Sequence, residues 1–300
     1  MSAISETSRA ARALSGALEP FTGQVYFSPE CHAGYEALGF GPSSAEVGGV
    51  QMPEIVAYFT SRGSVMGQVP GEVVAAAFGV FNPEIVVPSV TTGWTITDAP
   101  TVEAARTDGA VEQLRRVLGD APVGLDVAVD LLRRATDGLE PAGKPLFAGL
   151  CAQGVPDDPL AAAWRMGDML REYRGDAHVA VWTAAGFDAC EIGMLTELYW
   201  GLPTRSYART RGWSDASFDA AEARLVERGL LADGALTEAG RTEREAIEVA
   251  TDEAGAPYLR ALGDDVTTLV EILTPWSAAI REAKGYPAAG PVELAEAARR

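Results

Sequence analysis

The chain has 300 residues, 47% hydrophobic and 22% charged, enough for one large domain or two ordinary domains with hydrophobic cores. Its formal net charge of −18 argues against a polyanionic partner, because phosphate neutralisation supplies most of the affinity of nucleic-acid-binding proteins. No apolar stretch approaches the roughly 20 residues of a membrane span, and the amino terminus lacks the basic start and apolar run of a signal peptide. We therefore expect a cytoplasmic protein without membrane contact.

The cysteines indicate neither a disulfide framework nor a zinc site. Cys31, Cys151 and Cys190 are widely spaced and include no Cys-x-x-Cys pair. We expect reduced, mostly buried thiols that pack as small apolar side chains.

Helical periodicity dominates the chain, with Ala, Leu, Glu and Arg recurring at spacings of three and four residues. The sequence predicts a mainly α protein with helices over 5–18, 30–38, 52–66, 70–79, 83–91, 101–118, 123–137, 158–173, 177–186, 188–200, 215–228, 238–261, 264–283 and 291–298. The segment DGLEPAGKPLF (137–147) carries two prolines and two glycines. It is the predicted connection between an amino-terminal domain, 1–140, and a carboxyl-terminal domain, 141–300.

Two short helices of the first domain carry candidate site residues. In YFSPECHAGYEALGF, His32 lies within three residues of Glu30, and small neighbours permit close approach of a ligand or of another helix. An exposed amphipathic helix is the alternative. In AYFTSRGSVMG, Tyr58, Arg62 and Met66 follow at successive i, i+4 positions. Arg62 in that stripe either extends its stem along apolar surface or binds an anionic group.

The stretch LREYRGDAHVAVW (170–182) contains one of only two histidines. Gly175 is predicted to end one helix, and Asp176 to cap the next by accepting the amide of His178 or Val179. His178 would then lie in a first helical turn, where the helix dipole keeps the imidazole neutral and available as a base or ligand. A packing role between apolar neighbours is the alternative.

From 176 onward the order of elements is specific. Two short helices are followed by WSDASFDAAEARLVERGLL, by ADGALTEAG and by a long helix, with Asp233-Gly234 suited to a tight hairpin. In the phrases ARLVERGLL, DGALTEAG and IEVATDE this region, about 170–285, resembles the winged helix-turn-helix of MarR-type regulators. As a whole, the chain also resembles an actinobacterial family labelled helix-turn-helix, through FNPEIV, LREYRGD and RGW. That resemblance implies a fold and no activity.

The first half weakly echoes the second. EVVAAAFGVFNPEIVVPSVTTGW (72–94) aligns without a gap with HVAVWTAAGFDACEIGMLTELYW (178–200), and each segment is followed by an Asp-Ala pair before an Ala-rich helix. The pattern is compatible with a duplicated, degenerate winged helix in the first half. A small-molecule site would then be expected in a cleft between the halves.

The elements that would read DNA are acidic. A winged helix lays its second helix in the major groove with the wing on the backbone, surfaces that should carry basic and amide side chains. The helix over 214–228 has four carboxylates against Arg224 and Arg228, and the wing from Leu230 to Thr237 has no base. The preceding loop supplies Arg205, Arg209 and Arg211, which either contact phosphates or offset local acid.

Motifs for nucleotide, zinc-protease and hydrolase chemistry are missing: there is no GxGxxG after a strand, GxxxxGK[ST], HExxH or GxSxG. We predict no cofactor, although a mixed carboxylate and His iron site or an axial His for haem stays open. The leading hypothesis is a winged-helix-derived protein that no longer reads DNA and binds or transforms a small organic molecule by cofactor-independent cyclisation, elimination or isomerisation. The candidates are His178, His32 and Glu30 for catalysis, and Arg62, Arg174, Tyr58, Trp94 and Trp182 for substrate binding. The alternative is a ligand-responsive MarR-like transcriptional regulator, and a monomer and a homodimer both stay open.

Overall fold

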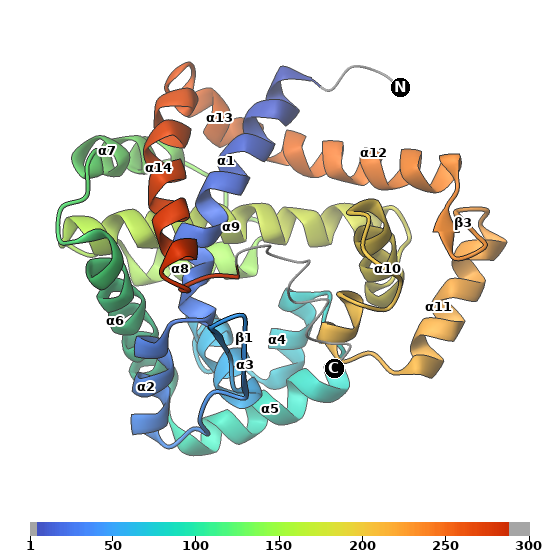
Figure 1. The fold of residues 1–300 in the computed structure, drawn as a ribbon, viewed down its shortest axis with the longest axis horizontal. Coiled ribbons are helices and arrows are strands. Elements are labelled where there is room, and N and C mark those ends of the chain that lie inside the picture. Colours follow the sequence, from blue (N-terminus) through green and yellow to red (C-terminus); the bar gives the residue numbers. More distant parts are fainter. Residues whose placement is uncertain (1–4, 288–300) are drawn as a thin grey trace.

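The computed structural model describes residues 5–287 and is mainly helical (Figure 1). The α-helices are α1 Glu6–Gly23, α2 Pro29–Leu38, α3 Ile55–Gly63, α4 Gly71–Phe78, α5 Pro83–Ile96, α6 Ala99–Leu118, α7 Leu125–Thr136, α8 Pro145–Gln153, α9 Pro159–Ala184, α10 Ala189–Tyr199, α11 Asp215–Glu227, α12 Glu238–Ala254, α13 Ala256–Leu262 and α14 Asp265–Glu282. Short 3₁₀ helices are η1 Gln24–Tyr26, η2 Ser64–Met66 and η3 Ala208–Arg211. Two hairpins pair β1 Ala45–Val47 with β2 Val50–Met52, and β3 Leu231–Ala232 with β4 Ala235–Leu236. Among the described residues no helix is long and apolar enough to cross a membrane.

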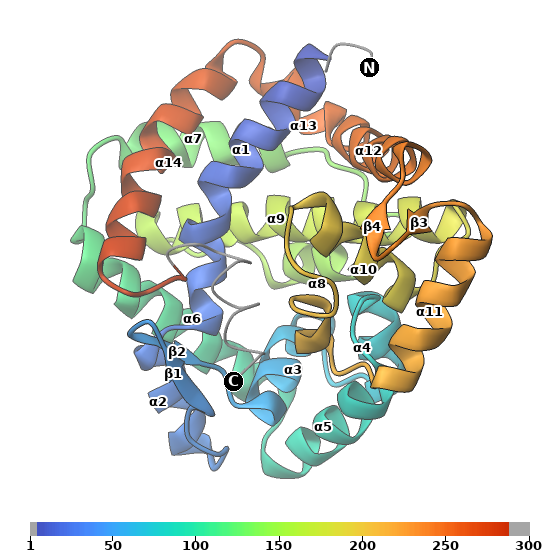
Figure 2. The ribbon, with the colours of Figure 1, turned by 45° about the vertical axis from the view of Figure 1, so that its right-hand side comes forward.

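Helix α9 runs through the middle of the molecule, and α1, α7, α8 and α12 pack on it (Figures 1 and 2). Its 26 residues give it a length of about 39 Å. The first half of α9 is buried almost all round, and Trp164 there is inaccessible to solvent. The second half leaves the large core and reaches the neighbourhood of α10 and α12.

The predicted break at Gly175 is wrong, because α9 continues through it to Ala184. The predicted helix over 177–186 is therefore part of α9, so Asp176 caps no helix of its own and His178 does not lie in a first turn. The Asp176 Oδ2 instead accepts the amides of Leu146 and Phe147, at 3.1 and 3.0 Å, in the first turn of α8. Helix α8 begins inside the segment 137–147, which was predicted as a connection. Its N-cap residue, Lys144, makes no side-chain capping bond, and Asp176 of α9 caps the helix instead.

Most other predicted helices are confirmed, although α1 and α5 each end five residues later than predicted, at Gly23 and Ile96. The helix predicted over 238–261 is two helices that meet at Gly255. The β1–β2 hairpin, with Gly48 and Gly49 at positive φ, was not predicted because three-residue strands leave too short a pattern. The helix predicted over 291–298 lies outside the described residues.

The apolar residues form two cores. The larger core draws on residues from 11 to 173 and again from 258 to 286, because α13 and α14 return to pack beside α1 and α7. The smaller core lies between 182 and 247. The cores therefore do not divide at residue 140, and the domain boundary proposed there stays a prediction.

The order of elements predicted for the carboxyl-terminal region is present. Helix α11 begins after Ser214, whose hydroxyl accepts the amide of Ser217, and it packs beside α10. Asp233 and Gly234, at φ of 50° and 73°, turn β3 into β4. In the first half, α4, α5 and α6 follow in the corresponding order, but among the described residues α6 leads into α7 without a strand pair.

Candidate functional site

A cavity of about 250 Å³ lies where α9, α10 and α12 meet the connection that contains η3. The two predicted halves meet there, since Val80 lines it from the first half. The polar and aromatic residues of its wall are Arg174 and His178 of α9, Thr196 of α10, Trp200, Tyr207 and Arg211 of the connection, and Arg244 and Glu248 of α12. Its volume is close to the lower end of the roughly 300–1,000 Å³ of ligand pockets, which limits it to a small molecule.

His178 presents an unprotonated nitrogen in this wall. Its Nδ1 lies 3.0 Å from the hydroxyl of Thr251, which itself donates to the carbonyl of Ile247. Because the Thr251 proton is committed to Ile247, Nδ1 must carry the proton and donate it, which leaves the lone pair on Nε2. No described residue hydrogen-bonds Nε2. Burial, with help from Arg244, lowers the pKa of His178 to about 4, so the ring is neutral at pH 7.

Arg174 and Arg244 are held by the same carboxylate. Both guanidinium groups contact Glu248, and Arg174 also contacts Asp252 at 3.0 Å. Burial opposes ionisation of Glu248, but the two arginines outweigh it and lower its pKa to about 2. Asp252 extends this network to Arg12 of α1 at 2.7 Å. These charges fix α9 against α12 and α1 on one side of the cavity.

Arg211 has a different environment. Its guanidinium carbon lies 4.5 Å from the ring centre of Phe81 and 4.7 Å from that of Tyr207, and it donates to the Tyr207 hydroxyl. Within residues 5–287 no carboxylate forms an ion pair with it. The backbone carbonyl of Arg211 accepts the Asn82 amide at 2.9 Å, which ties this segment to the first half.

The connection that carries Arg211 is held by a buried carboxylate. Glu197, with no exposed surface, accepts backbone amides of Arg205, Ser206 and Ala208. Burial raises the pKa of Glu197 despite these hydrogen bonds. One glutamate at the end of α10 thus determines the course of the chain into η3.

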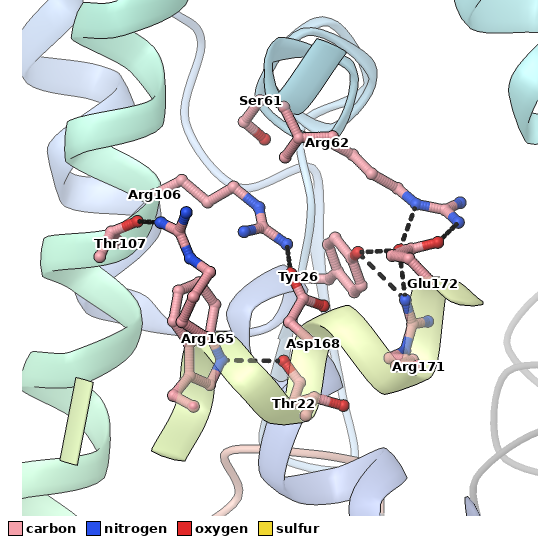
Figure 3. A network of polar contacts seen from close by, with 12 residues as sticks. Thr22, Tyr26, Ser61, Arg62, Arg106, Thr107, Arg165, Asp168, Arg171 and Glu172 are labelled. Atoms are coloured by element: carbon pink, nitrogen blue, oxygen red, sulfur yellow. Dashed lines mark hydrogen bonds and ion pairs between the residues drawn. The ribbon is translucent and has the colours of Figure 1, made fainter. Parts of the chain in front are cut away.

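Arg62 lies in a second cavity, of about 190 Å³, between α1, α3, α9 and α13. Its Nε and Nη2 bind both oxygens of Glu172, at 3.2 and 2.9 Å, while Arg171 approaches the same carboxylate from the other side (Figure 3). Burial opposes ionisation of Glu172, but Arg62 and Arg171 outweigh it and lower its pKa to about 2. Arg62 is therefore already paired, and Arg174 reaches both cavities.

His32 and Tyr58 lie near each other but away from His178. They line a space of only about 10 Å³, room for about one water. The His32 ring contacts the Gln51 side-chain oxygen at 3.2 Å and the Tyr26 carbonyl at 3.0 Å. Glu30 forms an ion pair with Arg116 and has no contact with His32. The structure thus does not bring Glu30 and His32 together as base and partner.

The two candidate tryptophans do not line the cavity. Trp94 of α5 donates to the carbonyl of Val69 at 2.8 Å, and Trp182 is buried in the smaller core. Of the eight candidate residues, the structure places only His178 and Arg174 in this cavity. Arg244 and Glu248 were missed, although with Thr251 they share the face of α12 that meets α9, a spacing visible in the sequence.

The arginines near α11 are paired with the acids of the same region. Arg205 contacts Asp219 and Glu222, at 2.8 and 2.6 Å, and Arg209 contacts Asp215 at 2.6 Å. Arg224 contacts Asp188 and Glu191, the capping box of α10. These guanidinium groups therefore already have anionic partners.

The described residues contain no group of three or more His, Cys, Asp or Glu side chains placed to hold a metal ion. No curated protein and no solved structure matches the chain. A family model described as a helix-turn-helix family matches residues 11–287, nearly the whole length. The chain therefore belongs to this helix-turn-helix family.

Proposed function

We propose that this protein is a winged-helix-derived, MarR-like member of its family that binds a small organic molecule in the cavity between α9, α10, α12 and η3. The observation that carries the proposal is His178, whose Nε2 lone pair has no partner among the described residues in the cavity wall. His32, in contrast, has a protein oxygen within hydrogen-bond distance of each ring nitrogen.

The chemistry open to His178 is proton transfer without a cofactor. A neutral imidazole can take a proton at Nε2 from an O–H or an acidic C–H of the bound molecule and return it elsewhere, as isomerisation, elimination or cyclisation requires. The donor bond from Nδ1 to Thr251 orients the ring and fixes the tautomer that leaves the lone pair on Nε2. Two arginines were predicted to bind an anionic group. Arg174 lies in the wall of this cavity, whereas Arg62 lines the other cavity.

Replacement of His178 tests the site. We expect wild-type protein to bind at least one member of a panel of benzoate, 2-naphthoate, indole-3-acetate and their primary amides, with crystal soaks locating it in the cavity. His178→Ala should weaken, at least about tenfold, the binding of the members that carry an N–H donor, the primary amides and indole-3-acetate, because the Nε2 acceptor is lost. The free energy of unfolding should fall only by about 0.5–1.5 kcal/mol, for the hydrogen bond to Thr251.

The matched control is His32→Ala, which alters the other histidine outside the cavity. It should leave probe affinity unchanged while lowering the melting temperature. A panel in which no member enters the cavity contradicts the proposed function, as does His178→Ala protein that loses stability but keeps its affinity.

Family membership favours a second candidate, a ligand-responsive transcriptional regulator. In that function α11 would enter the major groove, and Arg205 and Arg209 would contact phosphates. Those contacts would require both arginines to leave the carboxylates of α11. We therefore place this function second.

A further inference from the structure

The charges around the cavity identify the class of molecule that it takes. We infer that the ligand is a small organic monoanion, a carboxylate or a group of the same planar shape, which pairs with Arg211. This inference rests on the proposed function, since it assigns the chemistry of the same cavity.

The first step is the balance of charge in the wall. Arg174, Arg211 and Arg244 are three cations, and Glu248 is the one carboxylate among the lining residues. Asp252, behind Arg174, supplies a second negative charge that Arg12 also shares. One positive charge therefore remains within the described residues, and it is that of Arg211. A protein of net charge −18 has kept a locally cationic cavity.

The second step is the preorganisation of Arg211. Phe81 and Tyr207 lie near its guanidinium, and its main chain is fixed by the Asn82 amide. A guanidinium has five N–H donors, and only the bond to the Tyr207 hydroxyl occupies one. The edge that remains matches the two oxygens of a carboxylate, and little side-chain entropy is left to lose on binding.

The third step concerns the body of the ligand. Trp200 and Tyr207 lie with ring centres 5.4 Å apart in the wall, and Trp200 keeps 45% of its surface exposed. Ile192 and Val80 add apolar surface to the wall. Aromatic and aliphatic walls around one fixed cation suit a molecule with a single acidic group and a flat apolar body.

Matched acid and amide probes test the inference, with calorimetry for affinity and crystal soaks for location. Each acid should bind at least about tenfold more tightly than its primary amide, a gap of about 1.4 kcal/mol. Arg211→Gln should abolish that preference, while Arg211→Lys should keep part of it, because lysine retains the charge but not the planar fork. Arg209→Gln is the matched control, since Arg209 lies on the same 3₁₀ helix but pairs with Asp215 outside the cavity wall.

The outcomes separate the two proposals. Acid preference that disappears in Arg211→Gln and persists in Arg209→Gln supports the inference. Amides that enter the cavity as tightly as the acids, with His178→Ala still weakening them, overturn the monoanion and leave the proposed function standing. If neither acids nor amides enter the cavity of the folded wild-type protein, both proposals are overturned. If Arg211→Gln does not fold, the affinities of the matched acids and amides for wild-type protein still test whether the cavity prefers a monoanion.

Discussion

Two titratable groups two positions apart on α9 are shifted in opposite directions by burial. Burial raises the pKa of Asp176 to about 7, opposed by its bonds to the Phe147 and Leu146 amides, and lowers that of His178 to about 4. Both shifts favour the uncharged form. Asp176 differs from a simple surface acid in having one oxygen, Oδ1, that is buried without a described partner.

Asp176→Asn should change how stability depends on pH. The folded protein keeps the Asp176 proton up to about pH 7, whereas the unfolded chain loses it near the ordinary aspartate pKa of 3.8, so the wild-type protein loses stability as pH rises between these values. Asparagine keeps a carbonyl acceptor and does not titrate. We expect the free energy of unfolding of Asp176→Asn, relative to wild type, to be about 1–3 kcal/mol more favourable at pH 8 than at pH 5.

Urea denaturation at both pH values measures the effect. Asp176→Ala is the control, because it removes the same titration and also leaves the Leu146 and Phe147 amides without an acceptor: its free energy of unfolding should follow the pH profile of Asp176→Asn but lie about 1–3 kcal/mol lower at both pH values. Parallel pH profiles for wild type and Asp176→Asn would show that the Asp176 carboxyl does not titrate in this range.

At the scale of the element, the continuity of α9 makes Gly175 and Gly186 a matched pair. Gly175 lies inside the helix at ordinary helical φ, and an added Cβ would meet only Glu172 at 3.4 Å. Gly175→Ala should raise the free energy of unfolding by about 0.5–1 kcal/mol. Gly186 lies just beyond the helix at φ 77°, so Gly186→Ala should lower the free energy of unfolding by about 1 kcal/mol. Thermal melts of both variants distinguish a continuous α9 from one broken at Gly175, where alanine would destabilise.

The elements that the sequence predicted best are those that carry their own signals. Helices α10 and α11 begin at Asp188 and Ser214, whose side chains accept amides three residues on. Helix α8 could not be predicted, because its cap is Asp176, thirty residues away and inside another helix. Gly175-Asp176 has the local pattern of a helix boundary, but the tertiary packing of α9 keeps the helix continuous there.

The site shows the same division between local and distant information. His178 and Arg174 were both candidates from the sequence, but they share a helix face only because α9 continues through Gly175, where a break was predicted. Arg211 reaches the cavity only because Glu197 holds its loop and Asn82 binds its carbonyl. No spacing in the sequence encodes those two contacts, and of the residues in the cavity wall the sequence therefore indicated only His178 and Arg174 as site residues.

At the scale of the whole molecule, α9 links the two cores, and the cavity lies beside its second half. Arg12 of α1 contacts Glu245 and Asp252 of α12, so the amino-terminal helix, packed on the large core, also holds the helix that carries Arg244 and Glu248. The wall of the cavity is thereby tied to both cores. A molecule bound there would stabilise their arrangement by mass action, which makes the melting temperature a direct reporter of probe binding.

The acidity of the whole molecule and of α11 leads to the last prediction. We expect no specific binding of duplex DNA at physiological salt, because Asp215, Asp219 and Glu222 already neutralise Arg205 and Arg209 on the helix that would enter the groove. Fluorescence anisotropy with DNA from the protein's own upstream region measures it. A variant with Asp215→Asn, Asp219→Asn and Glu222→Gln is the matched comparison: it frees both arginines and should bind DNA at least about tenfold more tightly, with a steeper salt dependence. Submicromolar wild-type affinity that survives competitor DNA would instead show that the ion pairs open on DNA and that the regulator function is correct.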